Sequence, residues 1–509
     1  MPDAREYARR LVRGSSVVFL ALIGSQLAAL LLRMILARSF SEAEYGLFYS
    51  VFFFISFFGL FRELGLSSAL AKFIPEFVVK KQYGRIRSSL AIVIGIQAAA
   101  SVLIVLCLVL FSNHLALVFF KSEDAVLLLQ ILSAWFFVML FLNFLTVLQG
   151  LQRMTVYATL QFLRNFLVVV FAVIFIWFLG FGIEGVALAY LVELSVVVGL
   201  AYLLLRMMYP EIFLPSSSGG DLSGSLIRFA IPVFIGGIGG LVLSYMDTLM
   251  IQGFLGATDV GFYQVAYPTS HFLWYLPTAL VTVLLPMVSE IWTKRGKKLL
   301  GKGLEVLLKF SFLAILPAVI VFVAFPEIVI NILFGPKYLP ASATLQVLSL
   351  TAVPFTLFMI LSYVMQGVGK PIVATKVVLT IAALNFFGDL LLIPTYRILG
   401  AATATLLSYT FGAALLLASS REIIRLRAPF RSILKGLGGG ILSFLLILWL
   451  KSVIELHPWV ELFAVMVPGL VFYAAWLLFT KAIDREDLLI LAHVVPVPKR
   501  LLKVAQKIL

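Results

Sequence analysis

Charged side chains are scarce in this sequence. Lysine, arginine, aspartate and glutamate together make up 12% of the chain, whereas a soluble globular domain carries about 25%. Hydrophobic residues account for 62% of the 509 residues, and the mean hydropathy is +1.10. Because so few charges cannot cover the surface of a water-soluble protein of this size, we expect the lipid bilayer to be its main solvent.

Cysteine and histidine are also rare. The single cysteine, Cys107, excludes an intrachain disulfide and a cluster of thiolate metal ligands. The four histidines (His114, His271, His457 and His493) are far apart, and none has the H-E-x-x-H spacing of a zinc site. The sequence also lacks a D-x-D pair, a P-loop and a nucleophile motif. We therefore predict no metal site, no cofactor and no enzymatic activity.

The net charge of +15 does not indicate a nucleic-acid partner. The lysines and arginines lie in short loops between apolar segments, and nucleic-acid binding needs a continuous basic face instead. Orientation in a membrane explains the same residues, because cytoplasmic loops carry an excess of positive charge.

Fourteen apolar segments are long enough to cross a bilayer as helices, which takes about 20 residues each. They lie near 15–36, 46–71, 88–111, 125–148, 156–179, 183–205, 226–253, 262–289, 303–325, 341–367, 373–394, 398–420, 433–453 and 458–480. Strands of a membrane barrel are about half as long and alternate in polarity. The sequence therefore predicts an all-α integral membrane protein with about 14 transmembrane helices. The basic start of the chain resembles a signal peptide, but no cleavage site is visible, so we interpret the first segment as a retained helix.

The loops divide sharply by charge. Counting alternate loops from the N-terminus gives 29 lysines and arginines on one side and 5 on the other. The positive-inside rule places the rich side in the cytoplasm. We therefore predict a multi-pass protein of the cell membrane (inner or plasma membrane) with both termini in the cytoplasm.

The chain repeats itself at a shift of about 215 residues. The segment SEAEYGLFY (41–49) matches GATDVGFYQ (256–264), so Gly46 aligns with Gly261. The segment GIEGVALAYL (182–191) matches RILGAATATL (397–406). Three further pairs in the same order are LALVFF with INILFG, LLQILS with TLQVLS, and LQGLQR with MQGVGK. Helices 1–6 and 7–12 are therefore expected to form two lobes of the same orientation, as in transporters with parallel repeats. A static scaffold or channel is the alternative for a duplicated bundle.

These observations predict a division of the chain. The parts are a cytoplasmic N-terminal segment (1–14), an N-lobe (15–205), a cytoplasmic linker (206–225), a C-lobe (226–420), two extra helices (433–480) and a cytoplasmic tail (481–509).

Seven of the charged residues inside the predicted helices are candidates for a site, because a charge within the membrane is costly and usually faces a cavity or a partner. Three are arginines of the first lobe: Arg33, Arg62 and Arg164. The planar guanidinium group matches phosphate oxygens in pairs. Our hypothesis is that these arginines line a cavity and bind an anionic head group. The alternative is a purely structural pairing, for example of Arg62 with Glu193.

The remaining four are acidic: Glu63, Glu193, Asp247 and Asp389. They are candidates for cavity acids or for coupling to H⁺ or Na⁺, although Asp247 and Asp389 lie near helix ends, where an ordinary salt bridge serves as well. The segment LFRELGLSSAL (60–70) interrupts its apolar helix, which indicates either local unwinding toward a cavity or close helix packing.

The sequence resembles the polysaccharide-biosynthesis flippases, the O-antigen (Wzx-type) transporters of the multidrug/oligosaccharidyl-lipid/polysaccharide (MOP) exporter superfamily. The resemblance covers essentially the whole chain. It is carried by EAEYGLF (42–48), ELGLSSALAKF (63–73), LQGLQRMTVYATLQFLRN (148–165), MDTLMIQGFLGATDVGFY (246–263), LFGPKY (333–338) and the segment 368–405.

This resemblance implies two six-helix lobes in a MATE-like arrangement around a cationic cavity. It implies that undecaprenyl- or dolichyl-(pyro)phosphate-linked sugar moves from the cytoplasmic to the outer leaflet, with membrane lipids as neighbours. The alternatives in the same superfamily are a peptidoglycan lipid-precursor flippase and a multidrug/cation antiporter. An integral-membrane glycosyltransferase or polymerase is the alternative from another class.

Overall fold

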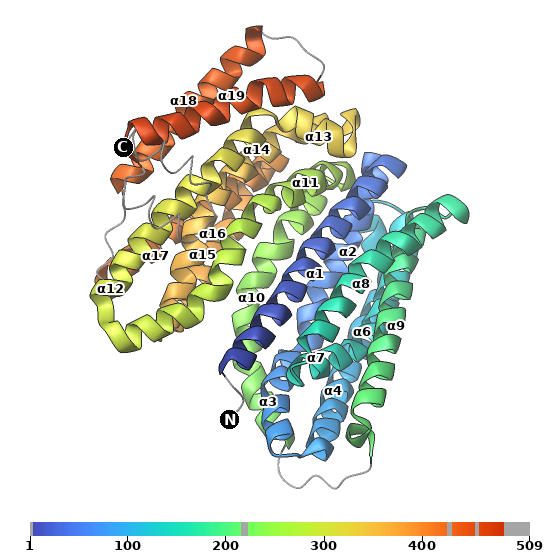
Figure 1. The fold of residues 1–509 in the computed structure, drawn as a ribbon. Helices are drawn as coiled ribbons and strands as arrows, with labels where there is room; N and C mark the ends of the chain where they lie inside the picture. The colour runs from blue at the N-terminus through green and yellow to red at the C-terminus, as the bar shows by residue number, and fades with distance from the viewer. Residues whose placement is uncertain (1–3, 215–221, 425–429, 454–457, 483–509) are drawn as a thin grey trace. The chain divides into compact units, whose positions relative to one another are not determined.

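The computed structural model describes residues 4–214, 222–424, 430–453 and 458–482, and throughout these residues it contains helices and no strand (Figure 1). Eleven described helices are long and apolar enough to cross a membrane, and the apolar helix 463–479 is shorter. The other predicted spans, 15–36 and 262–289, are also helical. The all-α class is confirmed. Of the expected tail (481–509), only residues 481 and 482 are described, and of the expected linker (206–225), residues 215–221 lie outside the described residues.

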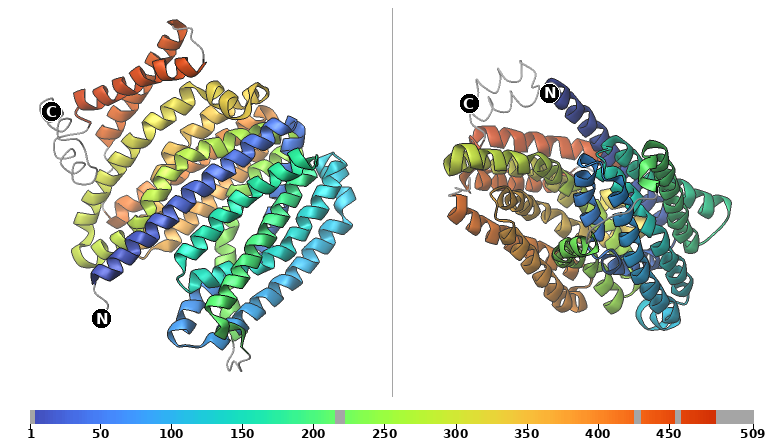
Figure 2. Two further views of the ribbon diagram at one scale, coloured as in Figure 1. Left: turned by 45° about the vertical axis from the view of Figure 1, so that its right-hand side comes forward. Right: turned by 90° about the horizontal axis from the view of Figure 1, so that it is seen from below.

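The chain forms two compact units, residues 1–264 and 265–509. The first contains α1 (Ala4–Ser39), α2 (Glu42–Glu63), α3 (Leu66–Val79), α4 (Tyr83–Leu110), α5 (Ser112–Leu115), η1 (Ala116–Phe120), α6 (Asp124–Met139), η2 (Leu140–Leu142), α7 (Asn143–Gly150), α8 (Met154–Val173), η3 (Ile174–Phe178), α9 (Ile183–Met208), η4 (Pro210–Phe213), α10 (Leu222–Phe254) and the start of α11 (Ala257–Ser270). Within it α1 runs alongside α8 (Figure 2).

The second unit continues from α11 into η5 (His271–Trp274), α12 (Tyr275–Ala324), α13 (Pro326–Phe334), η6 (Pro336–Ala341), α14 (Ser342–Leu350), α15 (Ala352–Gly367), α16 (Pro371–Tyr396), α17 (Ile398–Ile424), α18 (Phe430–Val453) and α19 (Pro458–Phe479). The segment between the predicted spans 262–289 and 303–325 is helical. It belongs to α12, which bends back on itself in Figure 1. Most residues of this connecting segment (290–302) are good helix formers, so the polar connection between the two spans forms helix instead of a loop.

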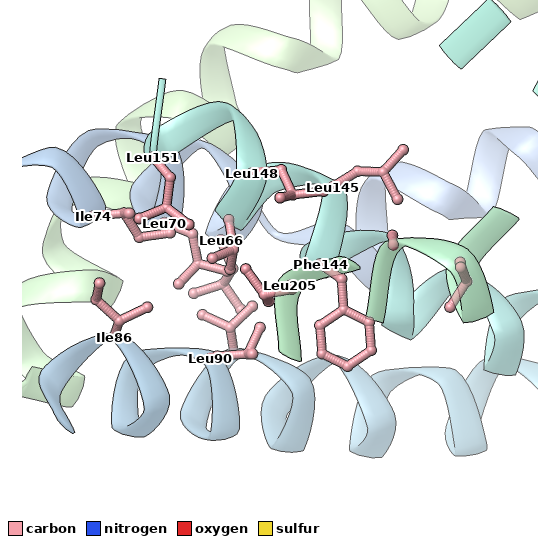
Figure 3. Close-up of a cluster of buried hydrophobic side chains, with 14 of the residues drawn as sticks. Leu66, Leu70, Ile74, Ile86, Leu90, Phe144, Leu145, Leu148, Leu151 and Leu205 are labelled. Carbon is pink, nitrogen blue, oxygen red and sulfur yellow. The ribbon is translucent and has the colours of Figure 1, made fainter. Parts of the chain in front are cut away.

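The core of the first unit lies where α3, α4, α7 and α9 meet (Figure 3). Its buried side chains include Leu66, Leu70 and Ile74 of α3, Ile86 and Leu90 of α4, Phe144, Leu145 and Leu148 of α7, Leu151, and Leu205 of α9. This apolar cluster holds α3 as a short helix separate from α2.

The predicted span 46–71 is two helices. Leu64 and Gly65 both have positive φ, 51° and 73°, and they separate α2 from α3. A Cβ atom on Gly65 would lie 2.5 Å from the carbonyl oxygen of Ala230 on α10. The chain therefore unwinds at this segment and also packs closely against α10. Glycine suits both demands, since it tolerates positive φ and has no side chain.

Helix boundaries follow the sequence repeat. Helices α2 and α11 begin at Glu42 and Ala257, and α9 and α17 begin at Ile183 and Ile398. Both pairs are separated by 215 residues. The start of α2 has a capping box in which the Ser41 hydroxyl accepts from the Glu44 amide and the Glu44 carboxylate accepts from the Ser41 amide.

The aligned glycines of the two repeats contact each other's helices. A side chain on Gly46 would collide with the carbonyl oxygen of Ala257, and one on Gly261 would collide with the carbonyl oxygen of Glu42. The repeat-related helix starts therefore cross with their backbones in direct contact, as small residues allow between membrane helices.

The Gly46→Ala substitution tests this crossing. The added methyl group meets backbone atoms that cannot move aside, so we expect unfolding to become easier by about 1–3 kcal/mol. The measurement is the thermal unfolding midpoint of the purified protein in detergent. Gly95→Ala in α4 is the matched control, because a Cβ atom there meets nothing within 4 Å. An unchanged midpoint in Gly46→Ala would contradict the close crossing.

Candidate functional site

A cavity of about 430 Å³ opens inside the first unit. Four helices, α2, α6, α8 and α10, supply its walls. The lining includes Phe52, Ser56, Gly59, Arg62 and Glu63 of α2, Trp135 and Met139 of α6, Arg164 of α8, and Ser244 and Tyr245 of α10. This volume is within the range of about 300–1,000 Å³ that is typical of ligand pockets.

The cavity extends along one face of α2. Its lining residues on this helix recur every three or four positions, which is the spacing of one helical face. Phe52 and Arg62 are ten residues apart, so they lie about 15 Å from each other along the helix axis. The Phe52 end of the cavity is aromatic, and the other end carries Arg62 and Glu63.

Arg62 is the buried cation of this cavity. Only 4% of the residue is exposed, and its Nε and Nη1 atoms have no hydrogen-bond partner among the described residues. Glu63 also lines the cavity, but no hydrogen bond joins the two side chains in the described part of the chain. Because a buried donor without an acceptor costs free energy, these N–H groups of Arg62 are suited to bind an anionic acceptor.

Arg164 lines the same cavity but has a partner. Its Nε atom lies 3.6 Å from Oε1 of Glu193, and the Glu193 side chain is 1% exposed. The other oxygen, Oε2, has no hydrogen-bond partner among the described residues. Glu193 therefore pairs with Arg164, and the expected pairing of Arg62 with Glu193 is wrong. Glu193 holds Arg164 and lowers the net positive charge behind the cavity wall.

Arg33 lies outside the cavity lining. Its guanidinium group is 4.4 Å from the Tyr49 ring centroid, and Nη1 donates to the backbone oxygen of Gln264 (3.3 Å) and to its Oε1 (3.1 Å). Gln264 in turn donates to the Thr248 hydroxyl (2.7 Å). These contacts link α1 with α10 and α11 close to the Gly46–Gly261 crossing.

The two deep aspartates are likewise separate from the cavity lining. Asp247 of α10 is buried and accepts a hydrogen bond of 2.5 Å from the Tyr263 hydroxyl. Asp389 belongs to α16 of the second unit and is fully buried. Of the seven residues singled out from the sequence, the structure thus brings Arg62, Glu63 and Arg164 together, with Glu193 directly behind Arg164.

Sequence reasoning missed the aromatic and small polar part of the cavity. Trp135 of α6 is 4% exposed, and its Nε1 has no hydrogen-bond partner among the described residues. Tyr245 and Ser244 of α10 also contribute. A tryptophan in an apolar segment has the signal of an ordinary core residue, so the sequence offered no means of selecting it. Among the described residues, no group of three or more His, Cys, Asp or Glu side chains is placed to hold a metal ion.

Comparison with known proteins gives the family. The profile of the family described as polysaccharide biosynthesis protein matches residues 11–292, and that of the MatE family matches residues 232–391. An uncharacterized membrane protein of Methanocaldococcus jannaschii is 29% identical over 79% of this chain and 82% of its own length. A probable low-salt glycan biosynthesis flippase of Haloferax volcanii, Agl15, is 22% identical over 62% of this chain and 66% of its own length.

The fold has a close counterpart among solved structures. The lipid II flippase MurJ in an inward closed conformation superimposes with a TM-score of 0.74 at 15% identity, covering 93% of this chain and 99% of that protein. This likeness confirms the predicted fold of the superfamily. Because the profile of the polysaccharide family covers more than half of the sequence, the chain is a multi-pass membrane transporter that belongs to the polysaccharide biosynthesis flippase family of the MOP superfamily.

Proposed function

We propose that the protein moves a polyprenyl-(pyro)phosphate-linked oligosaccharide from the cytoplasmic to the outer leaflet by alternating access. The observation that carries this proposal is the buried guanidinium group of Arg62, which faces a cavity and lacks a hydrogen-bond partner for Nε and Nη1 among the described residues. An anionic phosphate in the cavity would supply the missing acceptors. Arginine binds phosphate oxygens through parallel N–H donors.

The rest of the cavity suits a sugar. Its lining also includes the aromatic rings of Phe52, Trp135 and Tyr245, together with the small polar side chains of Ser56 and Ser244. Aromatic rings with a polar edge offer both an apolar face and a hydrogen-bond donor. A sugar ring presents the complementary surface, because its C–H faces are apolar and its rim carries hydroxyl groups. A head group with phosphate at one end and sugar at the other therefore fits both ends.

Relatives support a glycan cargo. The Haloferax volcanii protein Agl15 is described as a probable low-salt glycan biosynthesis flippase, and AglR of the same organism, 25% identical over 37% of this chain, as a probable flippase. A peptidoglycan lipid precursor is the second candidate cargo, since it has the same combination of phosphate and sugar. A cationic drug fits less well, because Arg62 would repel it. An enzymatic role finds no support in these relatives, whose names describe flippases.

The remaining parts of the proposal concern orientation and coupling. The 29 to 5 division of loop charges supports a cell-membrane protein with cytoplasmic termini, and the sequence repeat supports residues 15–205 and 226–420 as its two lobes. Among the acidic candidates for H⁺ or Na⁺ coupling, Glu63 and Glu193 are adjacent to the cavity cations, whereas Asp247 and Asp389 are placed elsewhere. We therefore favour Glu63 and Glu193 as the acids that sense the cargo.

Substitution of the three arginines should separate their roles. In vesicles containing labelled polyprenyl-linked oligosaccharide, Arg62→Met should reduce leaflet exchange by about 10- to 100-fold, because a charge-assisted hydrogen bond contributes about 1.5–3 kcal/mol. Arg62→Lys should recover part of the rate, since it restores the charge without the planar fork. Arg164→Met should reduce exchange less, because Glu193 already compensates its charge.

The matched control is Arg33→Met, which removes an arginine of the same unit that does not line the cavity. It should lower the thermal unfolding midpoint and leave the exchange of the lipid little changed. Full exchange by Arg62→Met, or drug transport with no exchange of the glycolipid by the wild type, would exclude the proposed cargo site.

Cysteine labelling tests the orientation. A single cysteine is introduced into a Cys107→Ser background, either as Glu123→Cys or as Gln152→Cys. Glu123 lies between η1 and α6, Gln152 lies between α7 and α8, and both residues are exposed. A membrane-impermeant maleimide should label Glu123→Cys on intact cells and Gln152→Cys only after permeabilisation. The reverse pattern would invert the proposed topology.

A further inference from the structure

The cavity contains a second buried donor that the proposed binding of phosphate leaves unused. The Nε1 atom of Trp135 has no hydrogen-bond partner among the described residues, and 4% of the residue is exposed. Leaving a buried donor unpaired costs free energy, and buried tryptophan usually finds a partner for its N–H group. Phenylalanine or leucine would fill this position on α6 without that cost.

The indole ring is fixed by aromatic neighbours. Its centroid lies 5.5 Å from that of Phe52 on α2 and 6.3 Å from that of Tyr190 on α9, and it meets the Tyr190 ring edge to face. Phe52 and Tyr190 also contact each other, with centroids 4.9 Å apart. Three helices therefore set the orientation of the indole, and a ligand would meet a preorganised ring.

Trp135 and Arg62 mark opposite ends of the cavity. Trp135 lies level with Phe52, and Phe52 is ten residues from Arg62 on the same face of α2, or about 15 Å along its axis. One unpaired donor is thus a cation, and the other is a neutral N–H group on an aromatic face. The matching ligand has an anionic group at one end and, some distance away, a neutral polar group with an apolar face.

We propose that Trp135 binds a sugar ring of the cargo, beyond the phosphate that Arg62 binds. The indole face packs against the C–H face of the ring, and Nε1 donates to a sugar oxygen. This inference rests on the proposed function and adds the direction of the cargo: the sugar lies toward the N-terminal end of α2, and the phosphate lies toward its C-terminal end. Trp135 is thereby a residue that determines specificity for the glycan.

The test compares three lipids of increasing head-group length: polyprenyl pyrophosphate without sugar, the same lipid with one sugar, and the lipid-linked oligosaccharide. Their affinities are measured for the full-length protein in nanodiscs. Trp135→Phe, which keeps an aromatic ring and removes the N–H donor, should weaken oligosaccharide binding about 3- to 10-fold, as expected for one hydrogen bond. It should leave binding of the sugar-free lipid unchanged.

Arg62→Met should weaken binding of all three lipids. The matched control is Trp177→Phe, which replaces a tryptophan that is 61% exposed, lies outside the cavity lining and donates to the Ser39 hydroxyl; it should bind all three lipids as the wild type does. Trp135→Tyr is the second variant at the site, because its hydroxyl group restores a donor and should recover part of the lost affinity. Thermal unfolding of each variant checks that it folds.

The outcomes separate the two proposals. Equal weakening of all three lipids by Trp135→Phe, or no weakening of any, overturns the sugar contact while the proposed function stands. If the wild type binds the sugar-free lipid and the lipid-linked oligosaccharide with the same affinity, the cavity does not bind the glycan and the inference is wrong. If the wild type binds none of the three lipids, the proposed function fails, and the inference fails with it.

Discussion

The cost of burying a guanidinium group in an apolar helix bundle is the constraint on which the interpretation of this protein depends. In the bilayer, water cannot satisfy such a group, so each deep arginine needs an acceptor from the protein or from a ligand. Arg33 has one in Gln264, and Arg164 has one in Glu193. Arg62 has no such acceptor for Nε and Nη1 among the described residues, and it borders a cavity. The difference in partners therefore divides three arginines that look alike in the sequence: two have acceptors in the protein, and one lacks them for Nε and Nη1 among the described residues.

Arg33 lies near the place where two helices that the duplication made equivalent, α2 and α11, cross. The glycines of the two repeats, Gly46 and Gly261, bring the starts of α2 and α11 into backbone contact. Polar bonds surround this crossing: the Ser50 hydroxyl donates to Gln252, and the Tyr45 hydroxyl donates to the backbone oxygen of Gln264. Hydrogen bonds between membrane helices contribute about 1 kcal/mol each. A crossing made of small residues and several modest bonds can thus be firm and still separable, which a transporter requires of any contact between its repeats.

Most of the fold was predictable because the bilayer fixes the length and composition of each helix. The repeat was also readable, and it placed the starts of α2 and α11 and of α9 and α17 in the same register. The site was only partly predictable. Helices that are apolar on all sides carry no periodic signal for the face that borders a cavity, so Arg33 could not be told from Arg62, and Trp135 could not be told from a core tryptophan. The continuous helix α12 was missed because polarity indicates exposure to water and does not by itself require a loop.

The charge balance of the cavity follows from what transport demands. A cargo site must bind strongly enough to load and weakly enough to release, so three uncompensated arginines around a pyrophosphate would trap it. In the structure, Arg164 shares its charge with Glu193, and Glu63 stands beside Arg62 at the cavity wall. Of the two cavity arginines, Arg62 lacks a hydrogen-bond acceptor for Nε and Nη1 among the described residues, and the aromatic side chains of the lining add contacts that are short-ranged and uncharged. In the proposed cargo site, such contacts would distinguish a sugar by shape and would be lost when the cavity walls separate. Selectivity that depends on fit more than on charge is therefore compatible with release on the far side of the membrane.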